Sequence, residues 1–407
     1  MFRLNGPQIH PIGIDIGHDS VKMLQLEVRE QSLVVHATAQ RMLDASGPAS
    51  TQPSPAELIS PQAAQAITEL LSDGNFAGRA AVASLPRHIV HVKNLRLPPM
   101  PAAEVAAVVQ FEARGIFPFD TDEAKVDFLI AGEVRQGTDV RQEVIVLAAR
   151  CADVDRFVEQ LHRTGLVVDS LDVEPCSLYR TIDRFVRRRE DEQEVHVLVD
   201  VGSRGTQVLI GKGREISFFK AIEMGGADFN LDVSRKLGIR PDEARALRRR
   251  FWTHAETDET VRQAVLDATR SAMENLTHEI CLCLRYHSVT FRGQRAVKVR
   301  VSGGEGGEAQ LLAKLYSALA IPVEPCRPLY NLDCSVMRGV DRRDPAGEWT
   351  VALGLALKRT AGKFAALDGT PRAATPPSPR SQAAVPASAA SPDEAIAAPV
   401  ATEAVNA

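Results

Sequence analysis

The stretch Ile12-Gly-Ile-Asp-Ile-Gly-His-Asp-Ser-Val-Lys-Met-Leu24 decides how the rest of the chain is interpreted. Its apolar residues from Ile12 to Ile16 predict a short strand that delivers Asp15. A glycine turn follows, and the apolar residues after it predict a second strand that returns as a hairpin. The stretch therefore predicts a strand–turn–strand unit that presents a carboxylate beside a tight turn.

The same arrangement recurs at Val195-His-Val-Leu-Val-Asp-Val-Gly-Ser-Arg-Gly-Thr-Gln-Val-Leu-Ile210, where Asp200 ends the strand. Two such hairpins predict two related halves that face each other across a cleft. Carboxylates that hold a metal, together with turns whose backbone N–H groups approach phosphates, form a nucleoside triphosphate site. The alternative is a pair of strand-end Asp residues that make Asx turns.

On the nucleotide hypothesis, Asp15 and Asp200 hold a Mg²⁺ ion through water molecules, because Mg²⁺ gives up its waters reluctantly. Gly17 and Gly202 let the backbone approach the phosphates, and the ammonium of Lys22 reaches a phosphate as a point charge. The other candidates for phosphate contacts, all in the two turns, are His18, Asp19, Ser20, Ser203 and Gly205.

A glycine-rich junction, Gly303-Gly-Glu-Gly-Gly307, follows an apolar strand and precedes a helix. Glycine here permits the close approach of a flat ligand such as adenine or ribose, and a helix N-terminus favours anions. Gly303, Gly304 and Glu305 are therefore candidate nucleoside contacts. The alternative is a flexible connection, and the spacing differs from that of a dinucleotide-binding fingerprint.

The composition is that of a globular protein and excludes several function classes. The chain has 407 residues, of which 44% are hydrophobic and 25% charged, enough for two or three domains or one large two-lobed domain. A formal net charge of −4 and 5% aromatic residues give no reason to expect a nucleic acid partner. No long apolar run predicts a membrane span, and no apolar signal segment follows Met1, so we expect a cytoplasmic protein with reduced cysteines.

Two further clusters have structural explanations that compete with functional ones. His278, Cys281, Cys283 and His287 suggest a metal site, but the two cysteines point to different faces of a predicted helix, which favours core thiols. The basic runs at 187–189 and 248–250 predict solvated helix ends, and the alternative is contact with an acidic partner or lipid headgroups.

The pattern of predicted elements divides the chain into five parts. They are a first-lobe core at 11–96, completed by 175–190 and 348–359; an inserted α/β module at 97–174; a second-lobe core at 194–226 and 295–345; a helical part at 227–294; and an Ala/Pro/Ser-rich tail at 360–407. The tail has too few large apolar residues to offset the entropy of ordering, so we expect it to be disordered.

With these features in place, the chain resembles the actin, Hsp70 and sugar-kinase superfamily. More closely, it resembles the PilM family of actin-like proteins of type IV pilus assembly, also named competence proteins, over about residues 11–358. The motifs that carry the likeness are Asp15–Lys22, Glu104–Asp127 with Phe111-Glu112 and Ile116–Phe119, Val173-Glu-Pro175, Asp200–Thr206, Met224-Gly-Gly226, Val301–Gly304 with Ile321-Pro-Val323, and Ala352–Ala356.

The resemblance implies an α/β chain with the duplicated actin-like ATPase (ribonuclease H-like) fold, in which two lobes surround a nucleotide cleft. The parts above would then be subdomain 1A, an inserted subdomain of the 1C type, 2A and 2B. It also implies a cytoplasmic assembly platform that binds ATP and Mg²⁺ and lies at the inner membrane through its partners. These are the N-terminal cytoplasmic peptide of a PilN-like membrane protein, bound near the inserted module, and other pilus assembly proteins. No residue stands out as one that orients an attacking water, so at most a slow ATPase is expected.

Two alternatives remain open. Arg245 and Arg248 stand where the family usually has an acid and a lysine that reach the ribose, and Glu305 stands where a small residue is common. These departures favour a scaffold with a vestigial nucleotide site, similar to the actin-like cytoplasmic parts of type II secretion proteins. A small-molecule kinase of the same superfamily would need a catalytic Asp beside a substrate pocket, and the segment 97–174 shows no such polar constellation.

Overall fold

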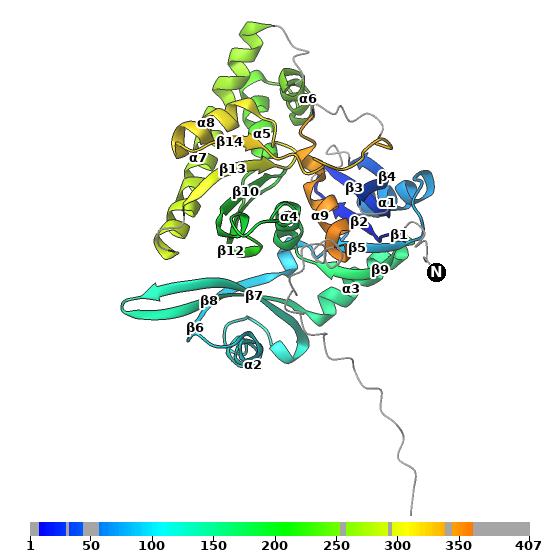
Figure 1. Cartoon of the computed structure of the whole chain (residues 1–407). Coiled ribbons are helices and arrows are strands. Elements are labelled where there is room, and N and C mark those ends of the chain that lie inside the picture. Colours follow the sequence, from blue (N-terminus) through cyan, green and yellow to red (C-terminus); the bar gives the residue numbers. More distant parts are fainter. Residues whose placement is uncertain are drawn as a thin grey trace, which may run out of the picture. The chain divides into compact units, whose positions relative to one another are not determined.

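The computed structural model describes residues 8–29, 32–43, 57–252, 258–291, 295–337 and 344–360. The tail predicted at 360–407 lies outside these residues apart from Thr360. Among the described residues, two larger sheets and one three-stranded sheet are formed, and the helices pack around them (Figure 1). Short 3₁₀ segments connect the main elements: η1 (Arg87–Ile89), η2 (Thr121–Glu123), η3 (Asp191–Gln193), η4 (Gly347–Trp349) and η5 (Leu357–Arg359).

The first sheet has the strand order β1-β3-β2-β5-β9, with β4 paired to the other side of β3. Its strands are β1 (Gln8–Ile9), β2 (Ile12–Ile16), β3 (Ser20–Arg29), β4 (Ser32–Met42), β5 (Ala80–Ser84) and β9 (Val167–Asp172). Side chains of α1 (Pro61–Asp73) and α3 (Cys151–Arg163) bury apolar residues of this sheet, with Ile67 and Phe157 at the centre of the cluster. The predicted first hairpin is confirmed, and β4 extends it as a third antiparallel strand.

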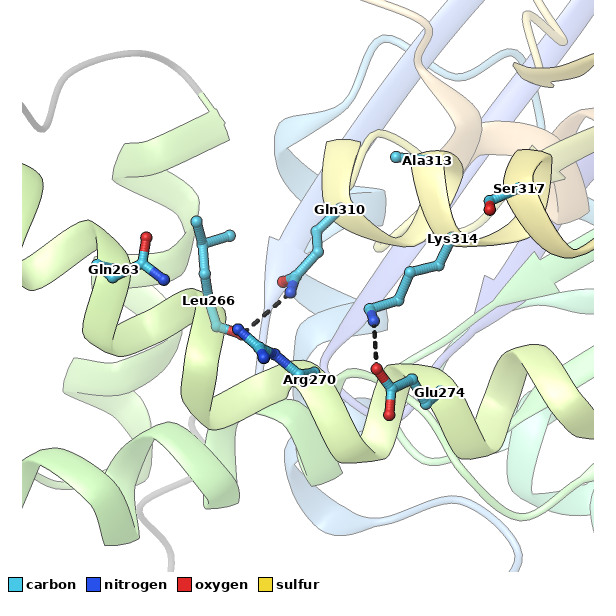
Figure 2. Close-up of a pocket in the computed structure, with 8 residues that line it drawn as sticks. All are labelled: Gln263, Leu266, Arg270, Glu274, Gln310, Ala313, Lys314 and Ser317. Carbon is cyan, nitrogen blue, oxygen red and sulfur yellow. Dashed lines mark hydrogen bonds and ion pairs between the residues drawn. The ribbon is translucent and has the colours of Figure 1, made fainter.

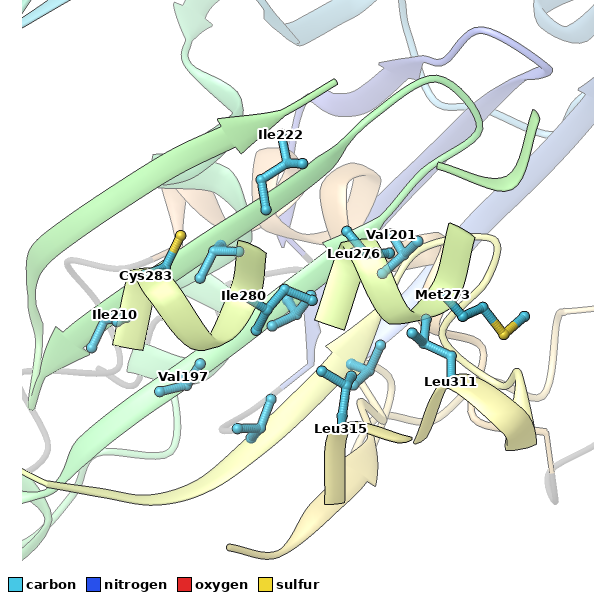
Figure 3. Close-up of a cluster of buried hydrophobic side chains, with 14 of the residues drawn as sticks. Val197, Val201, Ile210, Ile222, Met273, Leu276, Ile280, Cys283, Leu311 and Leu315 are labelled. Carbon is cyan, nitrogen blue, oxygen red and sulfur yellow. The ribbon is translucent and has the colours of Figure 1, made fainter. Parts of the chain in front are cut away.

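The second sheet has the strand order β12-β11-β10-β13-β14. Its strands are β10 (Val195–Val201), β11 (Thr206–Lys212), β12 (Glu215–Ile222), β13 (Ala296–Ser302) and β14 (Val323–Pro325). The helices of this half are α5 (Gly226–Leu237), α6 (Pro241–Trp252), α7 (Glu259–Thr290) and α8 (Ala309–Leu319). Figure 3 shows apolar side chains of α7 and α8, among them Ile280 and Leu315, packed on Val197 and Val201 of β10.

Two helices, α4 (Glu174–Asp183) and α9 (Thr350–Ala356), join the sheets through one apolar cluster that contains Val82 of β5 and Leu198 of β10. They cross at very short range, because a Cβ atom on Gly354 would lie 1.8 Å from the carbonyl oxygen of Ser177. Glycine is therefore required at this crossing, and the two halves of the molecule share a tightly packed junction.

The small sheet has the order β6-β8-β7 and packs on α2 (Ala102–Ala113). Its strands are β6 (His91–Leu97), β7 (Ala124–Gln136) and β8 (Asp139–Arg150). The pairing differs from the boundaries predicted at 97 and 174, because β6 already belongs to this sheet and β9 pairs with β5 of the first sheet. We therefore propose that the inserted module comprises residues 91–150.

The inserted module also packs on the second half of the molecule. Ala131 and Ile145 of the module form an apolar cluster with Phe291, which follows α7, and with Phe219 of β12. Gly132 has φ +122°, and a Cβ atom there would lie 3.4 Å from the Phe291 ring. The module therefore contacts the second sheet although it is inserted between strands of the first.

The helix α4 ends at Asp183, so the basic run at 187–189 lies beyond it. The part predicted to be helical at 227–294 contains the long helix α7. No described helix combines the length and apolar character that a membrane crossing requires. The six cysteines are free thiols.

Candidate functional site

The first acidic hairpin places Asp15 and Lys22 side by side. In the antiparallel pairing of β2 and β3, these two residues lie directly opposite each other. The Nζ atom of Lys22 is 3.4 Å from Oδ2 of Asp15, and the lysine side chain is buried. Asp15 and Lys22, seven residues apart in the sequence, therefore form a cross-strand pair, and the carboxylate already has a cation beside it.

Asp200 lies in a row of polar residues across the second sheet. Gln207 of β11 is its antiparallel neighbour, and Ser302 of β13 is its parallel neighbour. The Ser302 hydroxyl donates a hydrogen bond of 2.7 Å to Oδ1 of Asp200, and both side chains are buried. Burial raises the pKa of Asp200 to about 6; the bond from Ser302 lowers it, the Asp15 charge raises it, and Lys22 lowers it. The two predicted acidic residues therefore lie within electrostatic reach of each other.

The turns of the two hairpins are closed by matching backbone hydrogen bonds. The N–H group of Gly17 donates to the carbonyl oxygen of Ser20 at 3.0 Å, and that of Gly202 donates to the carbonyl oxygen of Gly205 at 2.9 Å. The similarity supports the prediction of two related hairpins, since each turn follows an acidic strand end and closes over the same number of residues.

The N-terminus of α5 braces the second turn. The N–H groups of Gly226 and Ala227 donate to the carbonyl oxygens of Gly202 and Ser203 at 2.9 and 2.8 Å. A Cβ atom on Gly225 would lie 2.4 Å from the carbonyl oxygen of Gly202, so only glycine permits this close approach. The glycine pair after Met224 therefore fixes the shape of the turn.

Asp19 joins the first turn to the second half of the molecule. Its carboxylate is 3.1 Å from Nη2 of Arg245 on α6 and 3.0 Å from Nδ1 of His18. Burial would raise the pKa of Asp19, but hydrogen bonds from His18 and Ser203 and the Arg245 charge hold that pKa below its ordinary value. The side chain of Asp19 is thus committed to protein partners, and its contact with a phosphate would have to use the backbone.

The glycine-rich junction lies next to Asp200 because β13 pairs with β10. Gly303 has φ +87°, and a Cβ atom there would lie 2.3 Å from the carbonyl oxygen of Val201. This glycine is therefore required by backbone packing. A Cβ atom on Gly304 would have no heavy atom within 4 Å, so this residue faces open space.

The predicted solvated helix end is wrong for Arg248, whose side chain is 2% exposed. Its Nη2 atom lies 2.6 Å from Oε2 of Glu305 and 3.1 Å from Oε2 of Glu308, and its Nη1 atom donates to Oδ1 of Asn230 at 2.8 Å. The carboxylate of Glu305 lies against Gly226, where a Cβ atom would be 2.2 Å from Oε1. Arg248 therefore ties the glycine-rich junction to α5 and α6.

Three residues that the sequence analysis did not assign complete the surroundings of Asp200. Glu174 begins α4, and burial raises its pKa to about 8; the Asp200 charge adds to the rise, and the Arg87 charge opposes it. The buried amide of Gln207 faces this carboxyl group, and its Nε2 atom has no hydrogen-bond partner at normal distance among the described residues. The motif Val173-Glu-Pro175 could have indicated Glu174, whereas nothing in the sequence indicates Arg87.

No group of three or more His, Cys, Asp and Glu side chains in the described part of the chain is arranged to hold a metal ion directly. Asp15 and Asp200 still suit a hydrated Mg²⁺ ion, because carboxylates commonly hold this cation through its waters. Near the second predicted cluster, Cys283 is buried in the apolar core, and Nε2 of His287 lies 2.9 Å from the Ser217 hydroxyl. This agrees with the core interpretation of that cluster.

A separate hollow lies between α7 and α8, and none of the predicted site residues lines it (Figure 2). Its walls are joined by an ion pair of 2.8 Å between Lys314 and Glu274, and by a hydrogen bond of 3.0 Å from Gln310 to the carbonyl oxygen of Leu266. These contacts connect the two helices across the hollow and account for its polar side chains.

The geometry can be compared with known proteins. The family model described as type IV pilus assembly protein PilM matches residues 13–360. The chain belongs to the PilM family. Membership confirms the resemblance inferred from the motifs. The chain has the actin-like ATPase fold, and the description of its family assigns that family to type IV pilus assembly.

Solved structures similar to this PilM-family chain include a PilM–PilN type IV pilus biogenesis complex, with 25% sequence identity, a TM-score of 0.67, and coverage of 86% of this chain and 98% of that chain. The ethanolamine utilization protein EutJ from Carboxydothermus hydrogenoformans is 11% identical, with a TM-score of 0.48 and coverage of 86% and 89%. The archaeal actin homolog Ta0583 is 14% identical, with a TM-score of 0.43 and coverage of 87% and 99%. No curated protein sequence matches the chain significantly.

Proposed function

We propose that this chain binds Mg²⁺·ATP between its two acidic hairpins and serves as an assembly platform of a type IV pilus inner-membrane complex. The observation that supports the proposal most directly is the approach of Asp15 and Asp200, from two different sheets, to within electrostatic reach. Two carboxylates with an adjacent lysine and two glycine turns provide oxygen ligands for a hydrated cation and donors for phosphates.

Within this site we assign different roles to the predicted residues. Asp15 and Asp200 hold the hydrated Mg²⁺, and Lys22 contacts a phosphate while keeping its pair with Asp15. Backbone groups of 17–20 and 202–205 contact the phosphates, since the Asp19 carboxylate is occupied by Arg245 and His18. Residues 303–305 contact the nucleoside, with Gly304 as the exposed member of the junction. We assign no residue to the orientation of an attacking water, in keeping with at most slow hydrolysis.

The partner that we propose is the N-terminal cytoplasmic peptide of a PilN-like inner-membrane protein, and the support is the similarity to a PilM–PilN complex. Through this partner the protein would be cytoplasmic and peripheral at the inner membrane, where other pilus assembly proteins join it. The inserted module offers a contact site, because Phe111 of α2 is 72% exposed there. A large exposed aromatic residue is a typical anchor for a peptide.

The nucleotide site is tested by replacing Asp200 with Asn, which keeps the shape of the side chain and removes its charge. We expect the affinity for Mg²⁺·ATP to fall at least about thirtyfold, which corresponds to about 2 kcal/mol. Isothermal titration calorimetry measures the affinity, and phosphate release in the same samples measures hydrolysis. The control is Asp169→Asn, which changes an exposed carboxylate paired with Arg359.

The partner is tested with the peptide by fluorescence anisotropy. Phe111→Ser is expected to weaken binding at least about tenfold, since the loss of an aromatic anchor costs about 2 kcal/mol or more of binding free energy. Val289→Ser is the matched control, because Val289 is 71% exposed but lies on α7. Equal affinities of Phe111→Ser and the wild type would place the peptide elsewhere, and no binding by the wild type would contradict the proposed partner.

The second candidate function is a scaffold with a vestigial nucleotide site. It is favoured by the Arg248 cluster, in which the Glu305 carboxylate is bound to arginine and packed on Gly226. The calorimetric titration separates the two functions, because a wild-type chain that binds no Mg²⁺·ATP would support the scaffold. A small-molecule kinase has no comparable support from the described residues of the inserted module.

A further inference from the structure

Arg87 crosses from the first half of the molecule to the phosphate-type turn of the second. It begins η1, which follows β5 after Leu85 and Pro86, and its guanidinium lies on Gly205. A Cβ atom at Gly205 would be 2.7 Å from Nη1 of Arg87 and 3.5 Å from its Cζ. The glycine in this turn therefore provides the space in which the guanidinium lies.

The charge of Arg87 is not neutralised by a close partner. Its guanidinium is within electrostatic reach of the carboxyl groups of Glu174 and Asp200. It nevertheless makes no hydrogen bond or ion pair with any residue that the structure describes. By contrast, Asp15 is paired with Lys22 and Asp19 with Arg245. Arg87 is thus a cation beside the turn of the second hairpin, and its donors are still available.

The neighbouring side chains reinforce this arrangement. Gln207 is 3% exposed, and its Nε2 atom has no hydrogen-bond partner at normal distance among the described residues. Gln207 lies next to Asp200 in the sheet, so its amide and the Arg87 guanidinium both lie near the carboxyl groups of Asp200 and Glu174. A buried amide without a partner costs free energy unless a ligand or water supplies one.

We propose that Arg87 contacts the terminal phosphate of a bound triphosphate and makes the site distinguish triphosphates from diphosphates. The inference rests on the proposed nucleotide site and assigns a specificity-determining residue to it. A guanidinium offers a planar fork of donors that matches two phosphate oxygens, and such charge-assisted pairs are about twice as strong as neutral ones. A diphosphate lacks the terminal phosphate that Arg87 would contact, so its affinity should depend little on this residue.

The position of Arg87 also links phosphate occupancy to the inserted module. The carbonyl oxygen of Arg87 accepts a hydrogen bond of 3.2 Å from the N–H group of Val90, which is packed on the apolar cluster around Phe291. The next strand, β6, is the first strand of the module. A phosphate that holds Arg87 would therefore fix the segment through which the module is attached.

The test uses the full chain and its Arg87→Gln variant, titrated by calorimetry with Mg²⁺·ATP, Mg²⁺·ADP and Mg²⁺·tripolyphosphate. We expect Arg87→Gln to weaken ATP and tripolyphosphate binding by about tenfold to a hundredfold and ADP binding by less than about threefold. His88→Ala, which changes the adjacent exposed residue, is expected to leave all three affinities unchanged. The unliganded melting temperature of Arg87→Gln should stay close to that of the wild type, because the Arg87 side chain makes no hydrogen bond or ion pair with the described residues.

The outcomes separate this inference from the proposed function. If the wild type binds ATP and Arg87→Gln binds it equally well, the role of Arg87 is refuted while the nucleotide site stands. If the wild type binds tripolyphosphate in an Arg87-dependent manner but binds ATP no better, the phosphate contact stands and the nucleotide function fails. If the wild type binds neither ligand, both are overturned.

Discussion

Replacing Arg248 with Met is expected to lower the free energy of unfolding by about 3–5 kcal/mol, because it leaves two largely buried carboxylates without their cation. The side chains of Glu305 and Glu308 are only 12% and 10% exposed, and both bind Nη2 of Arg248. Urea denaturation followed by circular dichroism measures the change. Arg248 also connects α5, α6 and the glycine-rich junction, so the variant should unfold this half of the molecule first.

Two further variants separate charge from packing at this cluster. Lys236→Met changes an exposed basic residue on α5 and should alter stability by less than about 0.5 kcal/mol. Adding Glu305→Gln and Glu308→Gln to Arg248→Met should recover most of the lost stability, because the uncompensated charges are gone. If Arg248→Met lowered the free energy of unfolding by less than about 1 kcal/mol, the buried ion cluster would be contradicted and the interpretation as a solvated helix end would be favoured.

The second large effect is expected at the crossing of α4 and α9. A Cβ atom on Gly354 would lie 1.8 Å from the carbonyl oxygen of Ser177 and 2.5 Å from its carbonyl carbon. Both are backbone atoms, so no rotation of a side chain relieves the overlap. Gly354→Ala should destabilise the protein by about 3 kcal/mol, at the upper end of the range for overpacking.

Thermal and urea unfolding measure this loss, and Gly115→Ala is the control, because a Cβ atom there would meet no heavy atom within 4 Å. The carbonyl oxygen of Gly354 also accepts a hydrogen bond of 2.6 Å from Nη1 of Arg180, so a shift of α9 would disturb this bond as well. If Gly354→Ala were as stable as the control, the two helices would not be packed as closely as described.

The hairpins and the glycine junction could be predicted from the sequence because their signals are local. A strand that ends in Asp-x-Gly and a returning apolar strand specify the pairing of Asp15 with Lys22 without reference to the rest of the chain. The neighbouring positions of Asp200 and Ser302 follow once β10 and β13 are parallel neighbours. The PilM family and the actin-like fold could therefore be predicted from the sequence alone.

The rest depends on contacts between residues far apart in the chain. The helix α6 is strongly charged, and Arg248 is buried through distant partners that include Glu305 and Glu308, 57 and 60 residues away. Arg87 reaches Gly205 because η1 follows a strand of the other sheet. The bounds that we propose for the inserted module, 91–150, also depend on such contacts, because β9 pairs with β5, a strand more than 80 residues earlier in the chain.

The packing of the inserted module on Phe291 and Phe219 couples the module to any movement between the two halves of the molecule. The module is joined covalently to the first sheet, through β6 and β8, and rests with β7 on β12 of the second. A rotation of one sheet against the other must therefore change the contact between β7 and β12. If a peptide on the module and a nucleotide between the hairpins each favour one rotation, each must change the affinity of the other by the same factor. A membrane partner would then change the affinity for the nucleotide by the same factor as the nucleotide changes the affinity for the partner.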